Sequence, residues 1–290
     1  MNKSTLGELD KRTWMSKVLD IDTLKLTDIV WPGAHNAGMD KKDLSHEEVA
    51  GHWTSCQNDT FAWQLDQGAR AFDIRLGYTT EADRPLFYFH HNGFRSTRVL
   101  DDLIDAVLSF LDRNPDEFII LDFHELGDGK QFFDHKQLVE LLIRRLGPRA
   151  VHALDGFRTV GELKKSSSQR RVIMAVPPVR ELDREYFWRR IAHKWRDNTF
   201  TAPDELRRYI SQTLEGAPFD AFLWSLSATG YSLLGPAHLK DHINAWFDTA
   251  QDWITRCSII STDFFDESEI VRYCWSASSM KAVYGDSLYD

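Results

Sequence analysis

The chain has 290 residues, of which 42% are hydrophobic and 27% charged, and its formal net charge is −9. This length suits one large domain, and the hydrophobic content is sufficient for a buried core. The negative charge argues against nucleic acid as a partner, because a phosphate backbone requires a basic surface.

Cysteine spacing and the N-terminus exclude further classes of protein. The chain has three cysteines, Cys56, Cys257 and Cys274, which lie far apart. An odd number of widely spaced cysteines indicates neither a disulfide framework nor a structural zinc site. The polar N-terminus has no apolar stretch typical of a signal peptide, and no run of about 18 apolar residues predicts a membrane span. We expect a cytoplasmic protein, or one exported without a classical signal, that contacts membranes only peripherally.

Short strand-like runs alternate with helical patterns along the chain. In chain order the predicted strands are 27–31, 70–76, 86–91, 117–123, 171–176, 221–226 and 258–262. Apolar stripes with helical spacing predict helices at 99–111, 138–146, 206–214 and 239–253. Strands interleaved with helices indicate a parallel sheet covered by helices. Seven strands, with an eighth not located, favour a closed α/β barrel of the TIM type over an open sheet.

We expect the whole chain, residues 1–290, to form this single unit, with a helical extension over 1–24 and a tail over 276–290. Residues 180–196 contain six basic and four aromatic side chains. They are interpreted either as a lid that contacts anionic lipid headgroups or as a solvated surface helix with one packed aromatic side. The composition favours the surface helix.

Polar side chains recur where the predicted strands end. Because successive strand residues face opposite sides, Asp73 and Arg75 share one face of their strand and emerge at its carboxyl end. The ends of the other strands carry His35, His91, Asp122 with His124, and Asp263. The carboxyl ends of barrel strands form the mouth at which barrel enzymes build their active sites.

These residue types form a set that suits phosphodiester cleavage. One histidine takes a proton from the attacking hydroxyl, a second protonates the leaving alcohol, and an arginine fork holds the phosphate oxygens. Each residue alone has a structural explanation as well: a strand-end histidine often only forms hydrogen bonds within the fold, and Asp73 beside Arg75 suits a simple internal ion pair. Their coincidence at one mouth favours catalysis.

Six segments carry a family pattern in order: WPGAHNAGMD (31–40), QLDQGARAFDIRLG (64–77), LFYFHHNGF (86–94), NPDEFIILDFHEL (114–126), the weaker WRDNTF (195–200), and STDFFDE (261–267) at the expected last strand. Together they resemble the X domain of the phosphatidylinositol-specific phospholipase C family. The resemblance spans about residues 25 to 270. It implies a single distorted β/α barrel that cleaves phosphatidylinositol-type lipids to a cyclic inositol phosphate and diacylglycerol.

The resemblance also implies a role for each site residue. His35 resembles the family's general base, His91 its general acid, and Asp263 the carboxylate that orients the base. Asp73 resembles the acidic residue on the second strand, and Arg75 the phosphate-stabilising arginine of the metal-independent bacterial members. The calcium-dependent animal enzymes have a metal-ligand carboxylate at the position of Arg75, so we expect no metal ion and no other cofactor.

Two positions depart from the bacterial pattern. Asn36 stands where an aspartate is usual, and an amide accepts a hydrogen bond without bringing charge. A His-Asn pair also resembles the calcium enzymes, which keeps a metal site as a lesser alternative. At the second departure, we assign the acid to His91 because it shares a strand face with Phe87 and Phe89, while His90 remains an alternative.

The expected reaction is an intramolecular attack on a phospholipid at a membrane surface, with no obligate protein partner indicated. Asn36 and His124 are expected to contact the substrate, although His124 suits a hydrogen-bonding role behind the site equally well. Two rival functions remain. A magnesium-dependent glycerophosphodiester or sphingomyelinase D type of phosphodiesterase is disfavoured by Arg75 beside Asp73, and a non-catalytic lipid-binding barrel by the completeness of the catalytic set.

Overall fold

The computed structural model describes residues 9–44, 51–130, 132–180, 182–196, 200–216, 222–250 and 252–285. Several predictions fall partly on residues outside these ranges. They concern the two ends of the chain, residues 181 and 197–199 of the basic and WRDNTF segments, and residue 221 of the sixth predicted strand.

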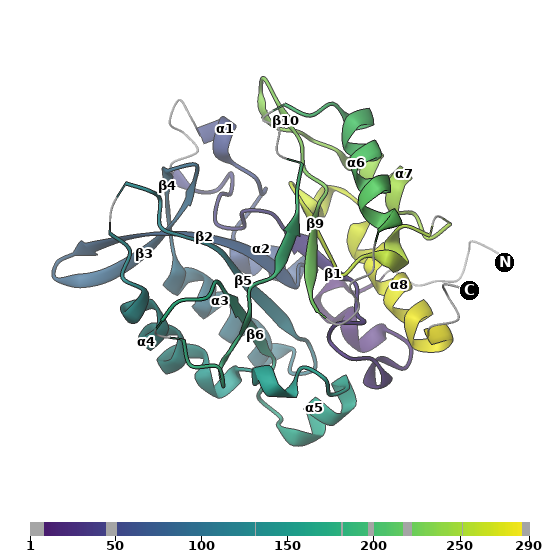
Figure 1. The fold of residues 1–290 in the computed structure, drawn as a ribbon, viewed down its shortest axis with the longest axis horizontal. Coiled ribbons are helices and arrows are strands. Elements are labelled where there is room, and N and C mark those ends of the chain that lie inside the picture. Colours follow the sequence, from purple (N-terminus) through teal and green to yellow (C-terminus); the bar gives the residue numbers. More distant parts are fainter. Residues whose placement is uncertain are drawn as a thin grey trace.

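Eight parallel strands follow one another around the barrel in chain order, and Figure 1 labels β1, β2, β5, β6 and β9 among them. They are β1 (Trp31–Ala34), β2 (Ala71–Glu81), β5 (Ile119–Leu126), β6 (Val172–Val176), β7 (Phe187–Arg189), β8 (Ala192–Lys194), β9 (Trp224–Ser227) and β12 (Ile259–Thr262). Pairing runs from β7 through β6, β5, β2, β1, β12 and β9 to β8. Within the described ranges no ladder joins β7 to β8, so the barrel is open along that seam. The predicted distorted α/β barrel is confirmed, while its expected closure is wrong at this point.

One predicted strand lies outside the barrel, and two barrel strands escaped prediction. β2 continues beyond the barrel, and β3 (Arg84–His91) returns antiparallel to it, followed by β4 (Phe94–Val99). The hairpin carries His91 back to the barrel mouth by a route that the sequence pattern did not indicate. β7 and β8 lie in the basic segment 180–196, so its interpretation as a surface helix is wrong. Three-residue strands are too short to show an apolar alternation.

The first strand begins later than predicted. A turn occupies the preceding residues, in which the Asp28 amide donates to the Lys25 carbonyl oxygen at 3.0 Å and the Asp28 carboxylate accepts from the Lys25 amide at 2.8 Å. Within β1, a side chain at Gly33 would lie 3.0 Å from both the Ile259 side chain and the Ile260 carbonyl oxygen. Glycine therefore permits the close approach of β1 and β12, whose carboxyl ends carry two of the predicted site residues.

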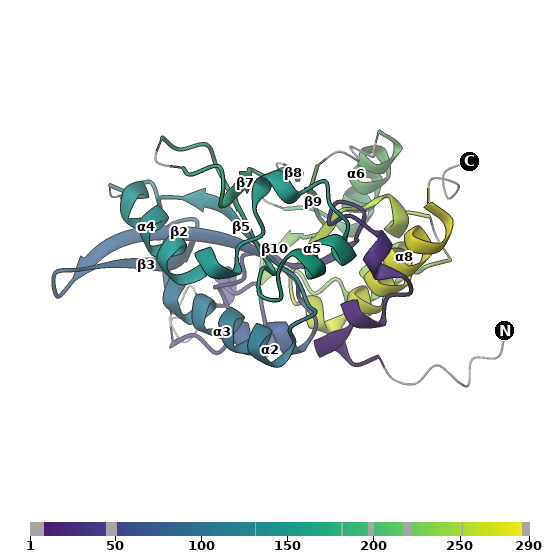
Figure 2. The same cartoon turned by 90° about the horizontal axis from the view of Figure 1, so that it is seen from below.

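The helices cover the outside of the barrel. They are α1 (Gly51–Thr54), α2 (Phe61–Asp66), α3 (Leu100–Arg113), α4 (His135–Leu146), α5 (Val160–Ser166), α6 (Pro203–Glu215), α7 (Lys240–Phe247) and α8 (Ile270–Tyr284). Figure 2 shows α2 and α3 side by side along one flank of the sheet. Three predicted helices are confirmed as α3, α4 and α6. The fourth, α7, ends at Phe247, well before residue 253, and α8 makes residues 276–284 helical, where a tail was expected.

The N-terminal segment covers the end of the barrel opposite to the mouth. Within its described residues, 9–24, it forms three short 3-10 helices, Lys11–Thr13, Met15–Lys17 and Ile21–Thr23, rather than a longer α-helix. The indole of Trp14 donates to the Gly68 carbonyl oxygen at 3.0 Å. Beside it, the fully buried Arg70 guanidinium lies 2.8 Å from the Glu117 carboxylate and donates to the Arg12 carbonyl oxygen at 2.7 Å. Paired and saturated with acceptors, this buried charge anchors the segment to the start of β2.

Candidate active site

A cavity of about 350 Å³ opens at the mouth of the barrel. Its titratable lining residues are His35, Arg75, His91, His124, Glu125, His193 and Tyr231. Four of the predicted site residues are thus brought together although they lie far apart in the chain. Asp73 and Asp263 are buried immediately behind them, where they contact Arg75 and His35.

His35 follows β1 and is held from two sides. The Gln57 side-chain amide donates to the His35 carbonyl oxygen at 2.7 Å, which fixes the backbone at the strand end. The Asp263 carboxylate lies 2.7 Å from His35 Nδ1, and Arg75 Nη2 lies 2.9 Å from His35 Nε2. A carboxylate only accepts and a guanidinium only donates, so the proton resides on Nδ1 and Nε2 carries a lone pair. This is the tautomer of a general base.

Arg75 places a permanent positive charge beside that base. The pairing of β2 with β5 shifts register between Ile74 and Arg75, an irregularity of the kind that redirects a side chain. Arg75 Nη2 donates to Asp73 at 2.9 Å. Burial alone would raise the pKa of Asp73, but Arg75 and the neighbouring histidines hold it well below its usual range. Burial opposes the charge of Arg75, yet the Asp73 carboxylate raises the pKa of this arginine and keeps it protonated.

His91 faces His35 across the cavity. The two ring centroids are 6.4 Å apart and the planes nearly perpendicular, at 88°. His91 Nδ1 lies 3.1 Å from the Thr54 carbonyl oxygen and 3.1 Å from the Tyr231 hydroxyl. Burial, followed by the positive charge of Arg75, lowers the pKa of His91 to about 3. Burial and Arg75 thus favour the neutral ring, and a nearby anion would favour the protonated ring.

The adjacent histidine points elsewhere. His90 is completely buried and is absent from the cavity lining. Its Nδ1 accepts from the Gly93 amide at 3.4 Å, and burial lowers its pKa. The geometry therefore agrees with the choice of His91 as the residue that faces the cavity, whereas its role as an acid stays a prediction.

Asn36 does not occupy the position expected for a substrate contact. It adopts a positive φ of 42° in the turn after β1, is completely buried, and does not line the cavity. Its backbone amide donates to Asp73 at 3.1 Å. The amide atoms of its side chain have no hydrogen-bond partner among the described residues. The turn directs this side chain away from the cavity, and its backbone helps to position Asp73 instead.

A second polar cluster was only partly predicted. His193 on β8 lies with Nε2 at 2.7 Å from Asp122 on β5 and at 3.0 Å from His124 Nδ1. Burial opposes protonation of His193, but the Asp122 hydrogen bond raises the pKa of this histidine. Burial lowers the pKa of His124 to about 3, against the influence of Asp73. His193 and Tyr231 were missed because one lies on a three-residue strand and the other on the two-residue β10 (Tyr231–Ser232), which pairs with β11 (Gly235–Pro236).

The residues around Asp73 do not fit a calcium ion, the alternative that Asn36 suggested. Asp73 Oδ2 accepts from Arg75 and from the Asn36 amide, and Oδ1 lies 3.4 Å from Arg75 Nε. Calcium requires carboxylate oxygens that are free to coordinate it. Here the guanidinium occupies that side of the carboxylate, and we derive no step through calcium.

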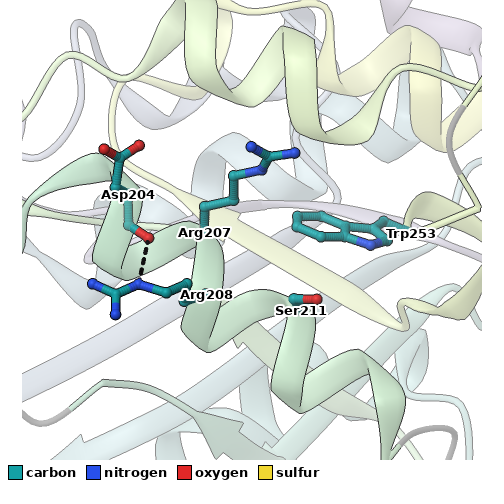
Figure 3. A pocket seen from close by; sticks show the side chains of 5 residues that line it. All are labelled: Asp204, Arg207, Arg208, Ser211 and Trp253. Atoms are coloured by element: carbon teal, nitrogen blue, oxygen red, sulfur yellow. Dashed lines mark hydrogen bonds between the residues drawn. The ribbon is translucent and has the colours of Figure 1, made fainter.

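Two other hollows share no lining residue with the cavity at the barrel mouth. Figure 3 shows one on the outer face of α6, lined by Asp204, Arg207, Arg208, Ser211 and Trp253. The other is mainly apolar and lies beside Phe157, Trp188 and Phe222. Neither described lining includes a histidine, so neither holds the acid–base pair found at the barrel mouth.

Sequence comparison finds relatives that carry the name of one domain family. No protein-family model matches the sequence. The chain is 29% identical over 141 residues to PI-PLC X domain-containing protein 2 of Homo sapiens, covering 41% of this chain and 45% of that protein. It is 26% identical over 165 residues to the Danio rerio X domain-containing protein 3, covering 49% and 50%. The chain spans about half the length of these curated relatives.

The fold comparison extends over nearly the whole chain. A phosphatidylinositol-specific phospholipase C from Listeria monocytogenes superposes with a TM-score of 0.65 at 15% identity, covering 92% of this chain and 98% of that one. One from S. aureus superposes with a TM-score of 0.64 at 16% identity, covering 91% and 97%. The chain is thus similar in sequence to PI-PLC X domain-containing proteins and similar in fold to bacterial phosphatidylinositol-specific phospholipases C. The predicted resemblance and the barrel fold are confirmed, while the roles of individual residues stay predictions.

One further relative is named for its activity. The chain is 30% identical over 136 residues to a variant-surface-glycoprotein phospholipase C of Trypanosoma cruzi, covering 44% of this chain and 33% of that protein. Among the described residues, none of the helices is both long enough and apolar enough to cross a bilayer.

Proposed function

We propose that the chain cleaves phosphatidylinositol-type lipids to a cyclic inositol phosphate and diacylglycerol. One observation carries the proposal: a neutral His35 with its lone pair beside Arg75 faces a second cavity-lining histidine at 6.4 Å between centroids. A base, an acid and a fixed cation thus converge on one cavity, as phosphodiester cleavage requires.

The proposed step begins at His35 Nε2, which takes the proton of the inositol 2-hydroxyl. The hydroxyl oxygen attacks phosphorus, the bond from phosphorus to the diacylglycerol oxygen breaks, and His91 protonates that oxygen. Arg75 holds the charged non-bridging oxygens. Asp263, at 2.7 Å from His35 Nδ1, stabilises the imidazolium that forms during the attack.

Binding of the substrate is expected to prepare the acid. The low pKa of His91 results from burial and from the positive charge of Arg75. A phosphodiester anion beside both groups offsets this charge and favours the protonated ring. Binding is therefore coupled to uptake of a proton, which limits the charged form of His91 to the complex.

The headgroup is proposed to lie against the second polar cluster. His124, Glu125 and His193 form one wall of the cavity, and the Ser227 hydroxyl, 2.7 Å from that of Thr229, lines another part. Inositol presents several hydroxyl groups that both donate and accept hydrogen bonds. We assign His124 as a substrate contact, as the sequence predicts.

The rim of the cavity suits a lipid surface. Trp195 lines the cavity and is 58% exposed, and Leu233 and Leu234, two and three residues beyond Tyr231, are 73% and 81% exposed. Across the mouth, Trp53 of α1 accepts a hydrogen bond from Tyr231, which places α1 beside the β10–β11 hairpin (Figure 1). With a net charge of −9, attraction to an anionic membrane is unfavourable overall, so we assign interfacial contact to these apolar side chains.

The test is incubation with phosphatidylinositol vesicles and detection of products by ³¹P NMR. We expect a cyclic phosphate from the wild type and none above background from His35→Ala. A matched control is His238→Ala, since His238 is an exposed histidine paired with Glu267 at 2.8 Å. Cleavage of glycerophosphodiesters or sphingomyelin in preference would support the first rival function. Vesicle binding without any cleavage would support a lipid-binding barrel.

A further inference from the structure

Asp122, His124 and His193 form a compact set of potential metal ligands in the cavity wall. One ligand atom from each lies within 4.8 Å of the other two. They come from two different strands, β5 and β8, so their proximity results from the barrel and not from local sequence. Arg75, which excludes calcium from Asp73, directs its side-chain hydrogen bonds to Asp73 and His35 and not to any of the three.

The spacing within the cluster matches an open zinc site after a small adjustment. His193 Nε2 is 2.7 Å from Asp122 Oδ2 and 3.0 Å from His124 Nδ1. A tetrahedral zinc ion with bonds of about 2.0–2.1 Å separates its ligand atoms by roughly 3.3 Å. Replacing the shared protons by an ion therefore requires His193 Nε2 to move away from Asp122 Oδ2 and His124 Nδ1 by a few tenths of an ångström.

A second observation at Asp122 also points to a ligand. This side chain is 4% exposed, and its Oδ1 has no hydrogen-bond partner among the described residues. A buried carboxylate oxygen without a partner is unfavourable unless something binds it. In addition, Asp73 Oδ1 lies 3.6 Å from His124 Nδ1 and adds negative charge next to the cluster.

Access and ligand type favour one class of ion. His124 and His193 line the cavity, so a fourth coordination position faces solvent. Two imidazole nitrogens and one carboxylate oxygen suit zinc and similar borderline transition metals, and not magnesium or calcium. The only other such group in the described part of the chain is His35 with Cys56 and Asp263. It contains the catalytic base itself, whose Nδ1 is engaged by Asp263, and the fully buried Cys56.

We propose that Asp122, His124 and His193 bind one zinc ion in the headgroup wall of the cavity. The ion is not part of the cleavage step, for which Arg75 supplies the charge. It instead takes the position of the inositol hydroxyls and withdraws His124 from them. Zinc therefore inhibits cleavage by competing with the lipid headgroup. This inhibition rests on the proposed function, whereas the binding of zinc does not.

The test is calorimetric titration of the chelator-treated, dialysed full chain with Zn²⁺. We expect one ion per chain. Loss of a group that only hydrogen-bonds to a metal ligand lowers metal affinity by about 10- to 100-fold. Loss of a ligand itself, in His193→Asn or Asp122→Asn, should therefore lower the zinc affinity by at least about 100-fold. Cys56→Ser and His238→Asn are the matched controls and should retain the wild-type affinity. Far-UV circular dichroism checks that each variant is folded.

A second measurement keeps the assignment testable if a variant fails to fold. Co²⁺ bound to the wild-type chain should give visible absorption bands of a four- or five-coordinate nitrogen and oxygen site without a thiolate charge-transfer band. Absence of stoichiometric binding, a thiolate band, or unchanged affinity in folded His193→Asn would overturn the site. Zinc binding without competitive inhibition would overturn only the inhibitory role. A chain that binds zinc but never cleaves phosphatidylinositol would instead refute the proposed function.

Discussion

Replacing Asp263 by asparagine tests whether this carboxylate acts through the general base. Asp263 accepts from His35 Nδ1 at 2.7 Å, while Arg75 donates to Nε2 of the same ring at 2.9 Å. An asparagine can present its NH₂ group to Nδ1, and the ring proton must then move to Nε2. That tautomer opposes the N–H of Arg75 with another N–H and removes the lone pair that accepts the substrate proton.

The expected loss follows from these contacts. A hydrogen bond to a charged group contributes about 1.5–3 kcal/mol, or roughly 10- to 100-fold in rate. Loss of the correct tautomer adds to this, and the equivalent change in a serine protease triad lowers kcat by about 10⁴. We therefore expect kcat to fall by between about 10² and 10⁴. Because Asp263 does not line the cavity, KM should change little.

The assay is steady-state release of inositol phosphate from phosphatidylinositol in mixed micelles, with kcat and KM determined separately. The matched control is Asp266→Asn, a nearby carboxylate whose oxygens accept from the Asn58 amide at 3.0 and 3.1 Å. This control should keep the wild-type kcat. A normal kcat in Asp263→Asn, or a raised KM at constant kcat, would refute the orienting role.

Three further predictions follow from the same site. His91→Ala should lower turnover by about 10²-fold or more and His90→Ala far less, because only His91 faces the cavity; a larger loss in His90→Ala contradicts the assignment. Arg75→Lys should be strongly impaired, since a single ammonium group does not reproduce a guanidinium fork that binds two phosphate oxygens. Chelators should leave wild-type activity intact. A loss of activity on chelation that calcium or magnesium restores would contradict the metal-free step. Finally, the pKa values of His91 and His124 are lowered to about 3 from an unfolded value near 6.5. The unfolded chain thus binds more protons between these values, and the free energy of unfolding should fall as pH falls from about 6.5 toward 3, with a smaller slope in His124→Gln; urea titrations at several pH values measure this, and equal slopes count against it.

Much of the barrel was accessible from sequence because its long elements have clear periods. The apolar stripe of α3 and the apolar runs of β5 and β6 are buried over several consecutive turns or residues. Their hydrophobic patterns are therefore long enough to be recognised in the sequence. β7 and β8 have only three residues each, too few for a period to appear. Their omission also hid the open seam and left His193 without a predicted neighbour.

The site was predictable where a residue lies at the carboxyl end of a barrel strand. His35 and Asp263 directly follow β1 and β12, and Arg75 lies near the end of the part of β2 that pairs with β5. The carboxyl ends of parallel strands meet at one mouth. His91 was correctly placed, although by an antiparallel hairpin rather than a barrel strand. Asn36 was misplaced, since a turn with positive φ decides where its side chain points, and residue type alone does not report that angle.

The central claim is that the inositol hydroxyl, and not water, attacks phosphorus at His35. Cleavage of phosphatidylinositol in H₂¹⁸O, with mass spectrometry of the first-formed product, tests this claim directly. An intramolecular attack predicts a cyclic inositol phosphate without ¹⁸O, followed by any acyclic phosphate only later. A first-formed acyclic inositol phosphate carrying one ¹⁸O would contradict the account, because it would mean that the base activates water.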